Sequence, residues 1–312
     1  MQIEKGIVMV CRTLYLHIGA PKAASTTLQK EVFPNLQGLT FLKKPKLGLV
    51  DGRFPWDGEF ARMILYSCRI WDRLGQAFFD RLIAAAEEKG GANQDILVSD
   101  ENMSVNRSID PVHLGNHFSM VEKWAKSYGF DAIKLLFITR RQDEWLASIY
   151  AQLSNRMPHA GQRHFDAWAT EQVNTDMGYY SHGISLDYLE IYNEAANVFG
   201  EKNIFFLPLE LMPRDPVGFI SKITDFLGIN GLAHSEIQRL VSNRLNVRSV
   251  SDGDSDELKK WRLRSRHKWM KWYKRSIQLD PHLSERVLAA YKTSNKTISE
   301  KTGFDLGEFG YY

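Results

Sequence analysis

The fold of this chain is decided by Leu14-Tyr15-Leu16-His17-Ile18-Gly19-Ala20-Pro21-Lys22-Ala23-Ala24-Ser25-Thr26-Thr27-Leu28-Gln29. The stretch begins as a short apolar strand, turns tightly around a lysine, and enters a helix start rich in hydroxyl groups. A strand that runs directly into a helix points unpaired backbone N–H groups, and the positive end of the helix dipole, at whatever lies over the turn. The stretch therefore predicts a site for an anion.

Side chains in the turn strengthen this anion site. Lys22 contributes a full positive charge, and Ser25, Thr26 and Thr27 contribute hydroxyl donors. The standard nucleoside-triphosphate loop needs a glycine directly before its lysine, and this chain has Pro21 there. The spacing Gly-x-x-Lys-x-x-Ser-Thr therefore indicates a different kind of phosphate loop.

A second candidate phosphate contact lies downstream. Residues 132–139 form an apolar run with the length of a buried strand. Arg140 follows this run, and Ser148 lies on the helix expected next. A guanidinium offers a planar fork of donors that matches phosphate oxygens, and a nearby serine closes the other side. Arg141 is adjacent and competes for the same role.

Strands and helices alternate along most of the chain. Apolar runs predict strands at 39–42, 95–99, 132–139 and 203–210, and helices are predicted at 28–32, 62–89, 111–128, 186–199 and 216–227. Residues 161–183 show no strong periodicity. The alternation predicts a three-layer α/β/α fold with a central, mostly parallel sheet. Ligands bind such sheets at the carboxyl ends of the strands, where both phosphate motifs lie.

Length and composition exclude several classes of protein. The chain has 312 residues and can bury one large core, and its net charge of +3 does not suit a nucleic-acid binder. No apolar run approaches the ~20 residues that cross a bilayer, and the first residues do not resemble a secretion signal. Two cysteines, Cys11 and Cys68, fit a reducing cytoplasm. We expect a single cytoplasmic domain over residues 1–312, without a transmembrane segment.

Residues 17–28 resemble the 5′-phosphosulfate loop of sulfotransferases that use 3′-phosphoadenosine-5′-phosphosulfate (PAPS). The usual core of that loop is Pro-Lys-x-Gly-Thr/Ser-Thr/Ser, and this chain has Ala24 where the family most often has glycine. Only a positive φ would exclude alanine there. In the same family, an arginine at a strand end and a serine eight residues later bind the 3′-phosphate. Arg140 and Ser148 have that separation, which favours Arg140 over Arg141, and Tyr150 also matches the family.

The resemblance covers about residues 13–230, with looser support from the stretch 205–229. It implies a fold like that of P-loop NTPases, followed by a helical extension at about 231–312. It also implies that PAPS is the sulfuryl donor and that 3′,5′-ADP is the product. The residues that it assigns to the nucleotide are Lys22, Ala23, Ala24, Ser25, Thr26, Thr27, Arg140, Ser148 and Arg248, and Asn246 is a further candidate.

Sulfuryl transfer needs stabilisation of negative charge on the leaving phosphate and removal of a proton from the acceptor. Lys22 fits the first need. Glu101 is the preferred base because it follows a predicted strand whose end should open near the nucleotide. The alternatives are Asp100, Asp57, Glu59 and His17.

No metal is expected in this scheme. His113 and His117 lie four residues apart on one expected helix face, but they have no third ligand and no glutamate between them. We interpret both as surface residues.

The expected acceptor is a hydroxyl or an amine on a small molecule or a glycan. Aromatic residues placed to stack on sugar rings are Phe54, Trp56, Trp168, Tyr179 and Tyr180. Two other functions stay open. One is a nucleotide kinase with a divergent phosphate loop, in which Asp100 would bind Mg²⁺. The other is a sulfotransferase-like protein that binds nucleotide without turnover.

Residues 259–275 form a basic segment. It contains nine lysines and arginines and no acidic residue, interleaved with Trp261, Trp269, Trp272 and Tyr273. One interpretation is an amphipathic helix with buried aromatic residues and a solvated basic side. The other is a positive wall beside the nucleotide or an anionic acceptor.

Overall fold

The computed structural model describes residues 11–19, 22–43, 63, 67–91, 93–100, 114–173, 186–229, 233–242, 259–265 and 275–312. Its centre is a five-stranded sheet made of β1 (Thr13–His17), β2 (Leu39–Lys43), β3 (Asp95–Ser99), β4 (Ala132–Thr139) and β5 (Ile204–Pro208). The strands lie in the order β2-β3-β1-β4-β5, and every neighbouring pair is parallel. This sheet confirms the predicted α/β fold class.

The carboxyl ends of the central strands meet at one edge of the sheet. His17 of β1 pairs in register with Ser99 of β3 and with Leu136 of β4. These apolar strands are buried because helices cover the sheet on both sides. The lysine loop and the Arg140 segment follow β1 and β4, so they are neighbours in space.

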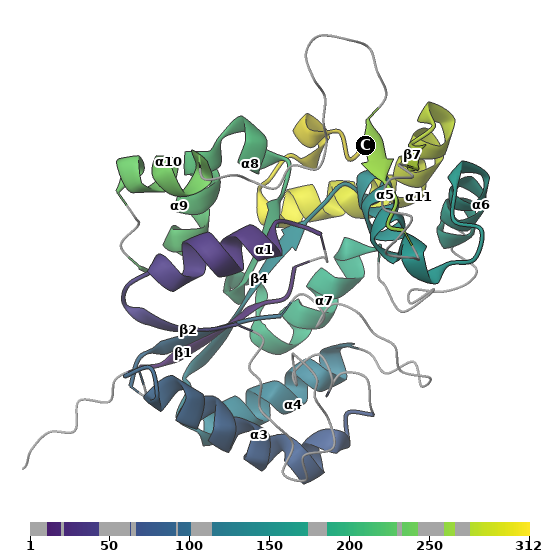
Figure 1. The fold of residues 1–312 in the computed structure, drawn as a ribbon. Helices are drawn as coiled ribbons and strands as arrows, with labels where there is room; N and C mark the ends of the chain where they lie inside the picture. Colours follow the sequence, from purple (N-terminus) through teal and green to yellow (C-terminus); the bar gives the residue numbers. More distant parts are fainter. Residues whose placement is uncertain are drawn as a thin grey trace, which may run out of the picture.

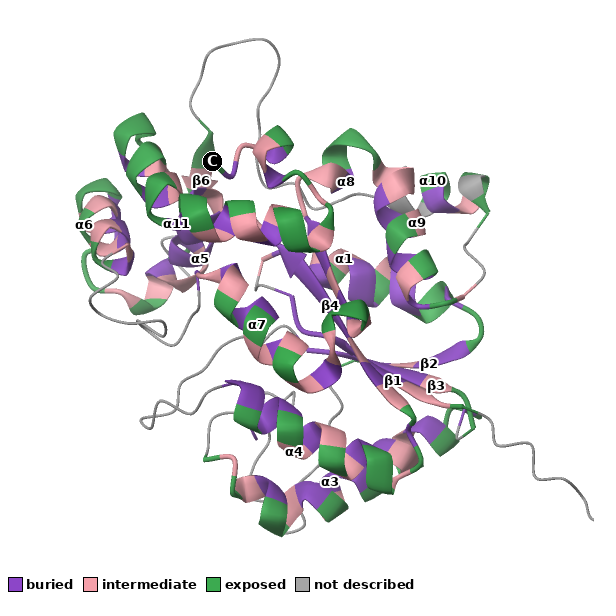
Figure 2. Cartoon of the chain, turned by 180° about the vertical axis from the view of Figure 1, so that it is seen from behind, coloured by how far each residue is buried: buried purple, intermediate pink, exposed green. Residues whose placement is uncertain are grey.

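Helices form the two outer layers (Figures 1 and 2). In both views α3 (Ile70–Glu87) and α4 (Leu114–Ser127) lie on one side of the sheet, and α1 (Ser25–Thr27) and α9 (Pro216–Phe226) lie on the other. Figure 2 colours the strands as mostly buried, so the core follows the sheet.

A second group of helices packs at one end of the sheet. It contains α5 (Gln142–Leu153), α6 (Gln162–Gln172) and α11 (Pro281–Thr302), next to a hairpin of β6 (Lys260–Arg262) and β7 (Ser276–Gln278). Helix α7 (Tyr188–Phe199) contacts both α4 and α11. The remaining short elements are η1 (Leu28–Val32), η2 (Phe33–Asn35), η4 (Ser154–Arg156), η7 (Glu201–Asn203), α8 (Leu211–Arg214), α10 (His234–Ser242) and η9 (Leu306–Phe309). None of the helices in the described segments has both the length and the apolar character of a bilayer span.

Two predicted elements differ from the structure. Within the helix predicted over residues 62–89, Met63 is helical, residues 68–69 form a turn, and α3 begins only at Ile70. Residues 162–172, inside the stretch without periodicity, form α6. Its buried residues are Phe165, Ala169 and Gln172. Only two of these three are apolar, so the helical pattern is too sparse to stand out in the sequence.

The basic segment is not an amphipathic helix over its described residues. Lys260–Arg262 pairs antiparallel with Ser276–Gln278. Along β6 and just beyond it, exposed lysine and arginine residues alternate with Trp261 and Leu263, which pack against the core. This alternation has the two-residue period of a strand, and the helical interpretation was therefore wrong there. Trp269, Trp272 and Tyr273 lie outside the described residues.

Candidate active site

Gly19 lets the end of β1 approach β4 closely. A Cβ atom built at Gly19 would lie 3.0 Å from the backbone nitrogen of Ile138 and 3.1 Å from its carbonyl oxygen. Any other residue would push the two strand ends apart. The lysine loop thus starts directly against the strand that carries Arg140.

The lysine loop has an unusual backbone. Lys22 has a φ of 71° and Ala24 a φ of 54°, while Ala23 between them is not left-handed. Alternation of left- and right-handed residues aims successive N–H groups into one concave anion site. The helical hydrogen bonds begin only with Thr27 and Leu28, whose N–H groups donate to the Ala24 carbonyl at 2.9 and 3.1 Å. The amides before them precede the helix ladder, the position from which backbone N–H groups bind anions.

The glycine-to-alanine change at Ala24 carries a conformational cost. The position does have a positive φ, so its alanine is strained rather than neutral. A left-handed residue with a Cβ costs roughly 1–2 kcal/mol. The fold holds this residue in the conformation that the family glycine would adopt freely.

Arg140 joins the two phosphate motifs. Its Nη1 donates to the Lys22 carbonyl oxygen at 3.0 Å, and its Nη2 lies 3.3 Å from Glu144 Oε2. Its Nε is buried and has no hydrogen-bond partner among the described residues. A guanidinium with a buried, unsatisfied N–H fits a phosphate oxygen.

Arg141 has a different environment. Its guanidinium makes two hydrogen bonds to Asp143, from Nε at 2.8 Å and from Nη2 at 2.9 Å. Its backbone N–H donates to Glu210 Oε1 at 2.9 Å. Arg141 is thus engaged in holding the β4–α5 turn, whereas Arg140 faces the lysine loop.

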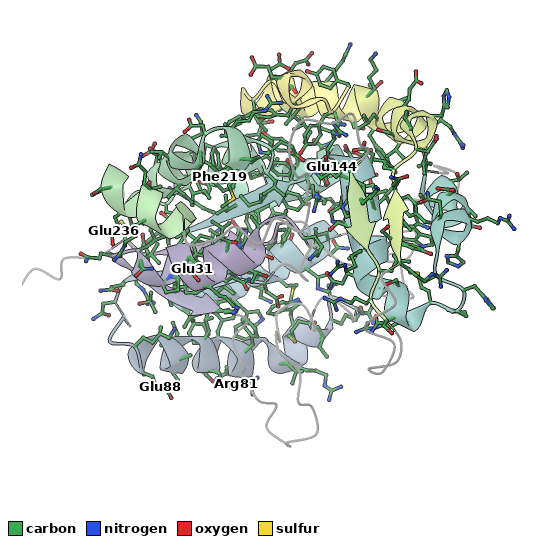
Figure 3. All side chains as sticks on the ribbon, turned by 45° about the horizontal axis from the view of Figure 1, so that its top comes forward. Glu31, Arg81, Glu88, Glu144, Phe219 and Glu236 are labelled. Atoms are coloured by element: carbon green, nitrogen blue, oxygen red, sulfur yellow. The ribbon has the colours of Figure 1, made fainter. Side chains whose placement is uncertain are left out.

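Glu144 links Arg140 to the β6–β7 hairpin, and Figure 3 labels it beside those strands. Lys259 Nζ donates to both carboxylate oxygens of Glu144, at 2.9 and 2.8 Å. Burial alone would raise the pKa of Glu144, but Lys259, Arg140 and Arg141 together hold it below its ordinary value. Glu144 therefore stays ionised and orients the guanidinium of Arg140.

Ser148 lies on α5, where its side chain is largely buried. Tyr150, two residues later, is a packing residue. Its hydroxyl donates to the Gly161 carbonyl at 3.1 Å and accepts from the Gly161 N–H at 3.0 Å. The ring of Trp168 packs against Tyr150, with 5.5 Å between ring centroids, so these two aromatic residues join α5 to α6.

Three buried polar side chains meet at the ends of β1 and β3. His17 Nδ1 lies 2.7 Å from Ser99 Oγ, and Gln29 Nε2 donates to the same oxygen at 2.9 Å. Ser99 Oγ therefore joins His17 and Gln29 in one buried hydrogen-bonded group. His17 is completely buried, and its Nδ1 is engaged by Ser99, which suits a structural histidine.

The other candidate bases are only partly covered by the structure. Asp100 is buried at the carboxyl end of β3, and its backbone N–H donates to the His17 carbonyl at 3.0 Å. The predicted site and aromatic residues that lie outside the described residues are Glu101, Asp57, Glu59, Asn246, Arg248, Phe54, Trp56, Tyr179 and Tyr180.

His117 is not a surface residue, contrary to the interpretation made from the sequence. It is completely buried, and its Nδ1 accepts a 3.1 Å hydrogen bond from Trp71 Nε1. The aromatic packing between α3 and α4 encloses it, which the four-residue spacing to His113 did not indicate. His113 lies outside the described residues.

Sequence reasoning missed a group of residues that contact the β4–α5 turn. These are Tyr188, Glu210, Asn295 and Tyr311, which contact residues 139–142. Only Glu210 carried a signal, because it ends a predicted strand. The others come from helices and a C-terminal segment distant in sequence.

Comparison with known proteins agrees with this fold. Residues 97–302, more than half of the chain, match the family described as the sulfotransferase domain. The fold is similar to that of a sulfotransferase from Alicyclobacillus acidocaldarius, with a TM-score of 0.53 and 13% identity over 96% of this chain and 99% of that chain.

Two other solved structures are less similar. The sulfotransferase domain of a Synechococcus olefin synthase has a TM-score of 0.44 and 14% identity, over 98% of this chain and 100% of that chain. A mouse sulfotransferase in complex with PAP has a TM-score of 0.41 and 16% identity, over 74% of this chain and 64% of that chain. A search of curated protein sequences gave no match.

Proposed function

Because this chain belongs to the sulfotransferase family, we propose that it moves a sulfuryl group from PAPS to a hydroxyl or amine acceptor and releases 3′,5′-ADP. The contact that carries this proposal is the hydrogen bond from Arg140 to the Lys22 carbonyl. It places one cationic side chain directly against the anion loop. A nucleotide with phosphates at both its 5′ and 3′ positions needs two such adjacent sites.

The nucleotide-binding residues follow from this arrangement. The lysine loop, through the amides and hydroxyls of residues 22–27, would hold the 5′-phosphosulfate. Arg140 and Ser148 would hold the 3′-phosphate, because the buried Nε of Arg140 lacks a partner among the described residues. We retain Arg248 as a nucleotide contact on the basis of the sequence.

The reaction breaks the bond between sulfur and the bridging phosphate oxygen and forms a bond from sulfur to the acceptor oxygen or nitrogen. Negative charge then develops on the departing 5′-phosphate. Lys22 and the loop amides would stabilise that charge, a role worth about 3 kcal/mol or more for a well-placed donor. The acceptor proton goes to a base, for which we keep Glu101 as the first candidate.

The proposal also names a class of acceptor. We include carbohydrate hydroxyls on the basis of the aromatic residues predicted to stack on sugars. Trp168 does not support this role, because its ring is engaged by Tyr150. We further propose that residues 1–312 form one sulfotransferase-like domain that works in the cytoplasm, consistent with its two free cysteines.

Calorimetry separates this function from that of a kinase. The protein is titrated with 3′,5′-ADP and, separately, with ATP and Mg²⁺. The proposal expects 3′,5′-ADP to bind more tightly. A preference for ATP with Mg²⁺ would instead assign the loop to a kinase and overturn the proposal.

A further inference from the structure

Three side chains from the C-terminal part of the chain contact the β4–α5 turn, which carries Arg140. Tyr311 Oη donates to Glu210 Oε2 at 2.8 Å and lies 3.1 Å from Thr139 Oγ1. Asn295 and Gln142 exchange hydrogen bonds through their side-chain amides, at 2.8 and 3.2 Å. The third side chain is Ser284 of α11, which binds Asp143. We call Ser284, Asn295 and Tyr311 the C-terminal brace.

The brace hydrogen-bonds to Thr139, Gln142 and Asp143, the residues that flank Arg140 and Arg141. Ser284 Oγ donates to Asp143 Oδ2, and Asp143 in turn holds the guanidinium of Arg141. Tyr311 fixes Glu210, which accepts the Arg141 N–H at 2.9 Å. The residues on both sides of Arg140 are therefore tied to α11 and Tyr311, directly through their side chains or, for the Arg141 N–H, through Glu210.

The brace is itself buried and connected. Tyr311 and Asn295 are completely buried, and Asn295 Nδ2 donates to the Tyr311 carbonyl at 3.1 Å. A polar network of this kind in the interior admits few alternative arrangements, because each broken bond leaves a buried group without a partner. A network of this kind is better suited to fixing the orientation of one side chain than to stabilising the fold in general.

Resting on the function proposed above, we propose that Tyr311 is a positioning residue for the 3′-phosphate site. Through Glu210 and Thr139 it sets the backbone from which Arg140 projects between Glu144 and the Lys22 carbonyl. Among the described residues, the Tyr311 hydroxyl bonds to Thr139 and Glu210 and not to Arg140 or Ser148. Loss of its hydroxyl therefore weakens recognition of the 3′-phosphate and leaves recognition of the 5′-phosphate intact.

The test measures the gain in affinity that the 3′-phosphate confers. Calorimetry gives the dissociation constants of 3′,5′-ADP and of 5′-AMP, and their ratio is that gain. The variants are Tyr311→Phe, which removes one oxygen, and Thr139→Val, which removes the partner hydroxyl at similar volume. Tyr15→Phe is the matched control, because the buried Tyr15 hydroxyl donates to the Leu227 carbonyl at 2.7 Å, away from the turn.

Tyr311→Phe and Thr139→Val should reduce the gain by about tenfold, with 5′-AMP affinity unchanged. Tyr15→Phe should lower the melting temperature without changing the gain. An unchanged gain in both turn variants, or an equal loss for both nucleotides, overturns the positioning role. A wild-type protein that shows no gain at all overturns the proposed function, and the brace inference with it.

Discussion

Arg140 Nη1 lies 3.0 Å from the Lys22 carbonyl oxygen and donates a hydrogen bond to it, across 118 residues of sequence. One guanidinium thus touches the anion loop while its Nε remains without a partner in the described part of the chain. In the proposed function, Arg140 binds the 3′-phosphate while it stays hydrogen-bonded to the loop assigned to the 5′-phosphosulfate.

Replacing Arg140 should therefore have a selective effect. Arg140→Ala is expected to weaken 3′,5′-ADP binding by roughly ten- to a hundredfold, the range for a charge-assisted hydrogen bond. Arg140→Lys should recover only part of this loss, because an ammonium lacks the planar fork. Calorimetry measures the affinity of both variants for 3′,5′-ADP. Arg73→Ala is the charge-matched control, because Arg73 lies exposed on α3. Equal losses for Arg140→Ala and Arg73→Ala would contradict the assignment.

Ala24 offers a test of the loop backbone. Its φ of 54° is left-handed, so Ala24→Gly should raise the free energy of unfolding by about 1 kcal/mol. Ala23→Gly is the matched control, since Ala23 is buried and not left-handed. That change should lower the free energy of unfolding by a similar amount. Urea denaturation measures the change in the free energy of unfolding for each variant. Destabilisation by Ala24→Gly would mean that the loop backbone is not strained.

Ser99 connects His17 and Gln29 inside the core. Ser99→Ala removes the hydroxyl that both side chains use, leaving the buried Nδ1 of His17 without its hydrogen bond. We expect a loss of about 1–3 kcal/mol in the free energy of unfolding. Ser119→Ala, on the exposed face of α4, should change it by less than about 0.5 kcal/mol. Similar results for the two variants would remove the basis for treating His17 as a structural histidine.

Glu190 should make stability depend on pH. Partial desolvation raises the pKa of Glu190 to about 7, from an ordinary value of 4.5, although the residue stays exposed to solvent, and the carboxylates of Asp187 and Glu194 add to the rise. Between these two values the unfolded chain has released a proton that the folded protein still binds. The free energy of unfolding therefore falls as pH increases through this window.

Glu190→Gln removes that fall. The free energy of unfolding of Glu190→Gln should exceed that of the wild type by more at pH 8 than at pH 5. Because Glu190 is exposed to solvent, this difference should stay within about 1 kcal/mol. Urea denaturation at the two pH values measures the difference. An identical advantage at both would show that Glu190 does not titrate as described.

The sequence predicted the sheet because its strands are short apolar runs that end in turn residues, and the local pattern was enough. It also favoured Arg140 over Arg141, although only through a resemblance. The structure adds a physical contrast between the two, since Arg141 binds Asp143 while Arg140 faces the loop.

Other features depended on tertiary contacts that no local pattern encodes. The left-handed backbone at Ala24 is imposed by the surrounding loop against the usual preference of alanine. Tyr311 reaches Thr139 from 172 residues away. His117 is buried where α3 packs on α4, and Trp71 of α3 donates to it there. Each of these required knowledge of which elements pack together.

The most direct test is turnover of radiolabelled PAPS with a panel of hydroxyl and amine acceptors, sugars included, by the wild type and by Lys22→Met. The wild type is expected to form a sulfated product together with 3′,5′-ADP. Lys22→Met should lower kcat on the order of a hundred- to a thousandfold, because the charge of the leaving phosphate loses its stabilising ammonium. A wild type that binds 3′,5′-ADP but never transfers the label would contradict the account, as would a Lys22→Met variant with full activity.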